Sequence, residues 1–177
     1  TEKHYFQGGY RNLRIVSDIV SIPVLCKDFV FDTYQLCEAR VYGADAVLLI
    51  VAALGRERFQ HLFTEARELG LQVLTEVHDE TELDIAVEAG AQVIGVNSRD
   101  LTTFETDLEL AHKLLAAIPA DRVKVAESGI AKPDDMRRLQ DAGADAFLVG
   151  EQLMKAGYPA RELHKLMDGC QQEAASQ

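Results

Sequence analysis

The sequence predicts an α/β barrel of parallel strands with about six βα units. Short apolar runs alternate with amphipathic helical segments along the chain. The same joint, Gly-Ala followed by a polar residue and an apolar run, occurs at Gly43, Gly90 and Gly143. No glycine-rich nucleotide-binding turn is present, whereas polar side chains end several of the apolar runs. This combination favours a barrel over an open doubly wound sheet.

Each unit has a strand signal followed by a helix signal. The expected strands cover residues 22–27, 45–51, 71–76, 92–97, 122–127 and 145–149. The expected helices cover residues 10–20, 33–42, 56–69, 80–89, 107–118, 133–142 and 159–168. The run at 45–51 is apolar after its first residue, as a central parallel strand covered on both faces should be.

Capping residues predict where the helices begin and end. Asp32 with Gln35, and Asp79 with Glu82, have the spacing of capping boxes. Pro133 suits the first turn of a helix, where its missing N–H costs nothing. Glycines follow four of the helices and act as C-terminal stops.

Length and cysteine content predict one intracellular domain. With 177 residues the chain can form one sizeable core, so we expect a single domain over 1–177 with a frayed polar tail over 169–177. A complete eight-stranded barrel needs about 250 residues, so about two βα units are expected to be missing at the N-terminus. The three cysteines lack metal-type spacing and are expected to be reduced thiols of a cytoplasmic protein.

Charge restricts the class of partner. The formal net charge of −11 argues against nucleic acid and against an anionic membrane surface. The longest apolar run is too short to span a bilayer. An anionic small molecule remains compatible, because a few local cations and backbone N–H groups can hold it.

Polar side chains end successive predicted strands. Lys27 ends the first strand, Glu76 the third, Asn97 the fourth and Glu127 the fifth. Right-handed crossovers bring the carboxyl ends of parallel strands to one face, where barrels build active sites. Taken singly, each residue is as well explained as a solvated strand end. Together they predict a site in which a lysine acts as general acid and a carboxylate as general base.

Two glycine-containing loops follow the last two predicted strands. They read Glu127-Ser128-Gly129 and Val149-Gly150-Glu151. In barrels these loops form the usual phosphate site, although plain turn glycines would look the same. The five histidines have no metal-type spacing, and for His78 a solvated or packed side chain is favoured over a functional one.

Seven segments resemble one enzyme family, in order and over nearly the whole chain. They are YFQGG (5–9), LCKDF (25–29), GADAVLLIV (43–51), LTEV (74–77), GVNSRDL (95–101), VAESGI (125–130) and FLVGEQLM (147–154). They are similar to indole-3-glycerol-phosphate synthase. The resemblance implies a (β/α)8 TIM barrel and a cytoplasmic carboxy-lyase of tryptophan biosynthesis. It implies ring closure of 1-(2-carboxyphenylamino)-1-deoxyribulose 5-phosphate with loss of carbon dioxide and water, and no metal or organic cofactor.

The resemblance also implies residue roles. Lys27 matches the general acid and Glu76 the general base of the dehydration, and Asn97 and Glu127 match further catalytic positions. The implied substrate-binding residues are Phe6, Phe29, Leu48, Arg99, Leu101, Ser128 and Leu148. The implied phosphate-binding residues are Gly129, Gly150 and Glu151. Many relatives have serine where this chain has Glu151, so its carboxylate is expected to turn away from the phosphate.

The family's first-strand motif, E-x-K-x-x-S-P-S, does not occur in this sequence. The chain resembles family strands three to eight, so weak or no activity is expected from it alone, and exposed strand edges would favour self-association. Two alternatives remain from the sequence. One is another phosphate-binding barrel, such as a sugar-phosphate isomerase or epimerase. The other is a non-catalytic fragment that serves as a folding or assembly unit.

Overall fold

The computed structural model describes residues 8–99 and 107–171. Phe6, Leu101 and residues 172–177 of the predicted tail lie outside these ranges. The chain divides into two compact units, Thr1–Val93 and Ile94–Gln177, and each is described by itself. That the two form one domain stays a prediction.

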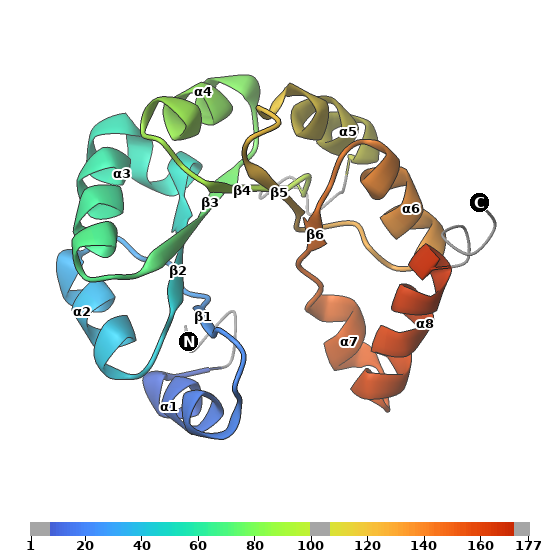
Figure 1. The fold of residues 1–177 in the computed structure, drawn as a ribbon, viewed down its shortest axis with the longest axis horizontal. Coiled ribbons are helices and arrows are strands. Elements are labelled where there is room, and N and C mark those ends of the chain that lie inside the picture. Colours follow the sequence, from blue (N-terminus) through green and yellow to red (C-terminus); the bar gives the residue numbers. More distant parts are fainter. Residues whose placement is uncertain (1–7, 100–106, 172–177) are drawn as a thin grey trace. The chain divides into compact units, whose positions relative to one another are not determined.

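Within residues 8–92, the first unit contains three parallel strands and four helices. Its elements are α1 (Tyr10–Ile19), β1 (Leu25–Cys26), α2 (Thr33–Val41), β2 (Ala46–Ile50), α3 (Val51–Glu68), β3 (Gln72–Val77) and α4 (Glu80–Glu88). The strands are in the order β1-β2-β3, and both neighbouring pairs are parallel. Helices α2, α3 and α4 lie along one side of these strands (Figure 1). This is the predicted βα alternation.

Two predicted elements in this unit differ from the observed ones by more than one residue at an end. Strand β1 has only two residues instead of six, and just before it the Val24 N–H donates to the Asp45 carboxylate. Helix α3 begins at Val51, not at residue 56, so the end of the apolar run is helical. Gly55 interrupts that helix with φ 68° and ψ 169°, and the predicted helix is the part after this break.

The two predicted capping boxes formed differently. At α2 the box is complete, because Asp32 accepts from the Tyr34 N–H at 2.8 Å and Gln35 accepts from the Asp32 N–H at 3.1 Å. At α4 the Asp79 carboxylate accepts from the Glu82 N–H at 2.8 Å. The Glu82 carboxylate, however, accepts from the His78 N–H at 2.7 Å. The second box is therefore only half formed.

The second unit continues the alternation. Its elements are β4 (Val93–Val96, whose first residue belongs to the first unit), α5 (Leu108–Ala117), β5 (Val123–Ala126), α6 (Pro133–Asp141), β6 (Ala146–Phe147), α7 (Glu151–Lys155) and α8 (Pro159–Gln171). Strands β4, β5 and β6 are in that order, and β5 pairs with β6 in parallel. The C-terminal helix extends three residues past its predicted end.

The repeated Gly-Ala-Asp joint has the same geometry in both units. The Asp45 carboxylate accepts from the Val24 N–H at 2.8 Å, and the Asp45 N–H donates to the Val24 carbonyl at 2.9 Å. Asp145 makes the same two bonds with Lys124, each at 2.9 Å. In both cases 21 residues separate the partners. Each aspartate thus fixes the start of the preceding strand.

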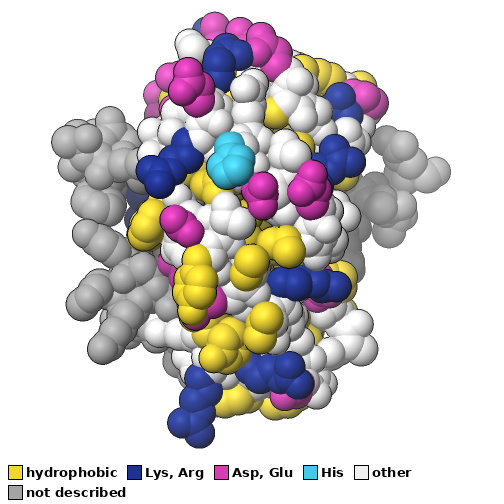
Figure 2. Space-filling model, turned by 90° about the vertical axis from the view of Figure 1, so that its left-hand side faces the viewer, with side chains coloured by type: hydrophobic (Ala, Val, Ile, Leu, Met, Phe, Trp, Pro, Cys, Tyr) yellow, Lys and Arg dark blue, Asp and Glu magenta, His cyan; other side chains and the backbone are white. Residues whose placement is uncertain are grey.

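Large apolar side chains fill the core of each unit. The fully buried ones are Leu36, Val47, Leu48, Leu49, Phe59, Leu62 and Leu71 in the first unit, and Ile94, Leu114, Leu115, Leu139 and Leu166 in the second. The surface over α2 and α3 mixes acidic, basic and hydrophobic side chains (Figure 2). Among the described residues, no helix is long and apolar enough to cross a membrane.

Candidate active site

Lys27 and Glu76 lie on one face of the strands of the first unit. In the register, Leu48 on β2 pairs with Leu74 on β3, and Ile50 pairs with Glu76. The β1–β2 register, extended by one residue past Cys26, places Lys27 beside Leu48. Because side chains alternate along a strand, Lys27, Leu48 and Glu76 share a face. Glu76 is only 2% exposed and Lys27 is half-buried, so both charges are partly desolvated.

The two apolar candidates of this unit differ in exposure. Phe29 is 38% exposed, and its loop is held by Gln35, whose side-chain amide donates to the Phe29 carbonyl at 3.0 Å. Leu48 is fully buried. Phe29 can therefore contact a bound molecule directly, whereas Leu48 supports the strand face from within the core.

His78 sits between two carboxylates just after β3. Its Nε2 atom lies 3.2 Å from Glu76 Oε1, and its Nδ1 atom lies 3.2 Å from Glu82 Oε2. Burial lowers the pKa of His78, but the hydrogen bonds and charges of Glu76 and Glu82 outweigh it and raise the pKa to about 9. The imidazole is therefore charged at neutral pH.

The sequence analysis did not predict the two carboxylate contacts of His78. The signal that could have found them is spacing, with a carboxylate two residues before His78 and another four residues after it. The first carboxylate, Glu76, ends a strand, and the second, Glu82, starts a helix. Only the turn between β3 and α4 brings both to the same ring.

Asn97 joins the ends of two strands in the second unit. The Ser128 hydroxyl donates to Asn97 Oδ1 at 2.6 Å, and the Arg99 N–H donates to the same oxygen at 3.2 Å. The Glu127 N–H donates to the Val96 carbonyl at 3.0 Å, which aligns the two strand ends. The side-chain oxygen of Asn97 is thus held in a fixed direction at the end of β4.

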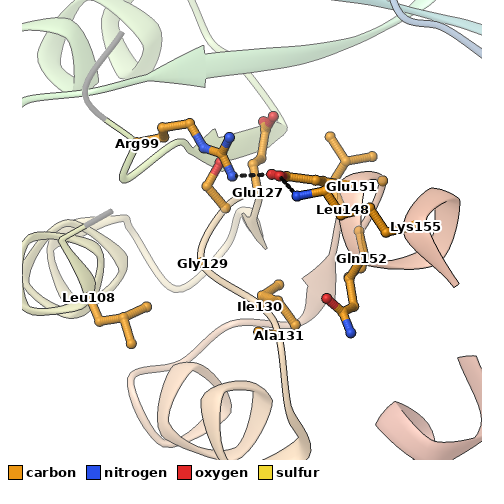
Figure 3. Close-up of a pocket in the computed structure, with 13 residues that line it drawn as sticks. Arg99, Leu108, Glu127, Gly129, Ile130, Ala131, Leu148, Glu151, Gln152 and Lys155 are labelled. Carbon is orange, nitrogen blue, oxygen red and sulfur yellow. Dashed lines mark hydrogen bonds and ion pairs between the residues drawn. The ribbon is translucent and has the colours of Figure 1, made fainter. Parts of the chain in front are cut away.

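Arg99, Glu151 and Lys155 form a charged cluster (Figure 3). Glu151 lies 2.6 Å from the Arg99 guanidinium through Oε2 and 2.6 Å from Lys155 Nζ through Oε1. Hydrogen bonds from Lys155 and Arg99 lower the pKa of Glu151 to about 2. Figure 3 shows the Arg99 and Lys155 side chains meeting at this carboxylate.

A cavity of about 430 Å³ adjoins this cluster. It is lined by the loops that follow the strands of the second unit, by the start of α5 and by α7. The lining residues are Arg99, Leu108, Glu127, Ser128, Gly129, Ile130, Ala131, Leu148, Val149, Gly150, Glu151, Gln152 and Lys155. Seven of the predicted site residues meet here. Sequence reasoning missed Lys155, although its position one helical turn after Glu151 was a usable signal.

No group of three or more His, Cys, Asp and Glu side chains in the described part of the chain is arranged to hold a metal ion. The chemistry that this arrangement offers is acid–base work and anion binding. A lysine and a buried carboxylate share a face in the first unit. In the second unit, an arginine, a lysine and two glycine-containing loops line a cavity.

Sequence relatives agree on one family. The family model described as indole-3-glycerol phosphate synthase matches residues 1–166. An indole-3-glycerol phosphate synthase from an Exiguobacterium species is 50% identical over 166 residues, which cover 94% of this chain and 65% of the relative. Another from Aliarcobacter butzleri is 46% identical over 165 residues, covering 93% and 63%. The chain thus spans less than two thirds of the length of these relatives.

Solved structures agree on the fold. The 3-hexulose-6-phosphate synthase from Salmonella typhimurium superposes with a TM-score of 0.77 at 18% identity, covering 93% of this chain and 81% of that one. A structure titled native KDPGal superposes with a TM-score of 0.67 at 19% identity, covering 98% and 79%. These likenesses show the α/β TIM-barrel fold. The family match and the identities of 46% and 50% show that the chain belongs to the indole-3-glycerol phosphate synthase family.

Proposed function

We propose that the protein closes the indole ring of 1-(2-carboxyphenylamino)-1-deoxyribulose 5-phosphate, giving indole-3-glycerol phosphate, carbon dioxide and water. The observation that carries the proposal is the family match over residues 1–166. The enzyme would be a carboxy-lyase of tryptophan biosynthesis acting in the cytoplasm on a phosphorylated, anionic small molecule.

In the proposed mechanism, Lys27 is the general acid. Its ammonium group donates a proton to the ketone oxygen of the substrate while the ring carbon that bears the carboxylate attacks the carbonyl carbon. Carbon dioxide then leaves and its bonding electrons stay with the ring. The half-buried position of Lys27 supports this role, because a donor acts more strongly where water is partly excluded.

Glu76 is the proposed general base of the dehydration. It removes a proton from the former methylene carbon beside the ring nitrogen, while the hydroxyl on the neighbouring carbon takes up a proton from solvent and leaves as water, which completes the indole. Its position on the same face as Lys27 and its 2% exposure suit this step. Asn97 and Glu127, at the ends of β4 and β5, are proposed to orient the reacting groups.

The remaining residues are proposed to bind the substrate. Phe29 and Leu148 are proposed to contact the aromatic ring and the carbon chain, and Arg99 and Ser128 the polar groups. Backbone N–H groups at Gly129, Gly150 and Glu151 are proposed to hold the phosphate. The cavity that these loops line supports this assignment.

The experiment is a fluorescence assay for indole-3-glycerol phosphate on the protein as its gene encodes it. Lys27→Ala should lower kcat by about 10²–10⁴-fold, the range of a lost general acid. Lys165→Ala is the matched control, because Lys165 is an exposed lysine on α8. Full turnover by Lys27→Ala would refute the role of Lys27. No turnover by the unmodified protein would refute the proposed function.

A further inference from the structure

We propose that His78 is a positioning residue for Glu76. From the turn between β3 and α4, the His78 ring holds the Glu76 carboxylate ionised and oriented. The inference rests on the proposed function, in which Glu76 is the general base. His78 acts through Glu76 and needs no contact with the substrate.

The geometry leaves the imidazole little freedom. Nε2 lies 3.2 Å from Glu76 Oε1, and Nδ1 lies 3.2 Å from Glu82 Oε2. The same Glu82 oxygen accepts from the His78 main-chain N–H at 2.7 Å. Rotation of the ring would break contacts on both sides, so the position of the Nε2 atom that faces Glu76 is fixed.

Glu82 is itself anchored by the start of α4. It is the third residue of that helix, and its N–H donates to the Asp79 carboxylate at 2.8 Å. The helix start therefore holds Glu82, Glu82 holds His78, and His78 holds Glu76. This explains why Glu82 leaves its capping box incomplete.

Because these side chains are largely buried, the positive charge of His78 affects the ionisation of Glu76. The side chain of Glu76 is 3% exposed, that of Glu82 is 15% exposed and that of His78 is 17% exposed. A buried carboxylate is favoured in its neutral form unless an opposite charge lies close by. Glu76 from β3 and Glu82 from α4 are the titratable groups that raise the pKa of the imidazole, which supports a charged ring at neutral pH.

Two substitutions separate the charge of the ring from the polar contact that it makes with Glu76. In His78→Gln the side-chain amide nitrogen can lie near the former Nε2 atom and keep a polar group beside Glu76, but the charge is gone. In His78→Asn the amide nitrogen lies near the former Nδ1 atom, so only the contact with Glu82 is kept. His61→Gln is the matched control, because His61 is an exposed histidine on α3.

The first measurement is the pH profile of turnover. Both variants should lower kcat by about 10–100-fold, the usual effect of removing an outer partner of an active group, with His78→Asn the more severe. KM should stay within about twofold, because substrate contacts are unchanged. The acid limb of the His78→Gln profile should move up by about 1–3 pH units. An unmoved acid limb would overturn the proposal.

The second measurement does not need turnover. The carboxyl ¹³C resonance of Glu76 can be followed by NMR as a function of pH, with Glu76→Gln for its assignment. In His78→Gln the titration of Glu76 should move to higher pH, whereas in His61→Gln it should not move. An unchanged titration would overturn the proposal. A shifted titration in a protein that makes no indole-3-glycerol phosphate would uphold the coupling and refute the proposed function instead.

Discussion

The Glu151 carboxylate lies 2.6 Å from the Arg99 guanidinium, at the edge of a cavity lined by three strand-end loops. The protein's own carboxylate therefore already pairs with the arginine that an anionic ligand would meet there. Lys155 contacts the same carboxylate at 2.6 Å, so both nearby cations are engaged. A ligand phosphate or carboxylate must compete with Glu151 for them.

We therefore expect Glu151→Gln to strengthen anion binding. Inhibition by inorganic phosphate should become about threefold to tenfold tighter, which corresponds to the loss of two exposed, competing ion pairs. The difference should shrink with added salt, because the cluster is exposed. The control is Glu109→Gln, which removes an exposed ion pair with Arg138 away from the cavity. Weaker phosphate inhibition in Glu151→Gln would show that the carboxylate organises the site rather than competing.

The His78 cluster should make stability depend on pH. Folding raises the pKa of His78 from 6.5 to about 9, so the folded state holds the proton more tightly than the unfolded state. The stabilisation is fully present below pH 6.5 and is lost as the pH rises through about 9. Its size is about 3 kcal/mol in the free energy of unfolding.

Urea denaturation at several pH values between 6 and 10 measures this slope. His78→Gln should remove most of it, whereas His61→Gln should keep it. Equal slopes in the unmodified protein and in His78→Gln would assign the pH dependence to another group.

The aspartate of the repeated joint should contribute to stability. Asp45→Ala leaves the Val24 N–H without its carboxylate acceptor and should lower the free energy of unfolding by about 0.5–1.5 kcal/mol. Asp45→Asn keeps an acceptor oxygen and should cost less. Chemical denaturation of the two variants gives the comparison, and equal losses would mean that charge, not the hydrogen bond, is responsible.

Gly43 should tolerate a side chain worse than Gly70 does. Both have positive φ, 90° and 73°, so alanine at either position is strained by about 1–2 kcal/mol. A Cβ atom at Gly43 would also collide with the Ser17 side chain, whereas one at Gly70 would meet nothing within 4 Å. Gly43→Ala should therefore cost about 1–3 kcal/mol more than Gly70→Ala. Thermal unfolding of the pair tests this, and equal costs would show that Ser17 moves away freely.

The sequence predicted the order and type of the elements because their signals are local. Apolar runs, the Asp32–Gln35 box and the terminal glycines act within a few residues, and the structure has strands and helices where they indicate. Two elements of the first unit differ from the prediction. Strand β1 is shorter than predicted, and the contact beside its start joins Val24 to Asp45, 21 residues away, which has no local signal. The helical start at Val51 was hidden because an apolar run fits a strand and a buried helix equally well.

Site residues were predicted from their positions, and their partners were not. The strand-end pattern selected Lys27 and Glu76, and the register extended past Cys26 puts both on one face, while their roles stay predictions. The Arg99–Glu151 contact joins residues 52 positions apart and has no local signal. His78 needed the geometry of a turn, and Leu48 could be seen as fully buried only once its neighbours were in place.

The matched joints at Asp45 and Asp145 have a consequence for protein engineering. Each joins the two ends of a βα segment with the same pair of hydrogen bonds, between residues 21 positions apart. The two segments are therefore suited to exchange, because the ends of each are joined by the same hydrogen bonds, away from the loop that follows its strand. Segments 24–45 and 124–145 could therefore be exchanged as building blocks, with new chemistry brought in on their loops.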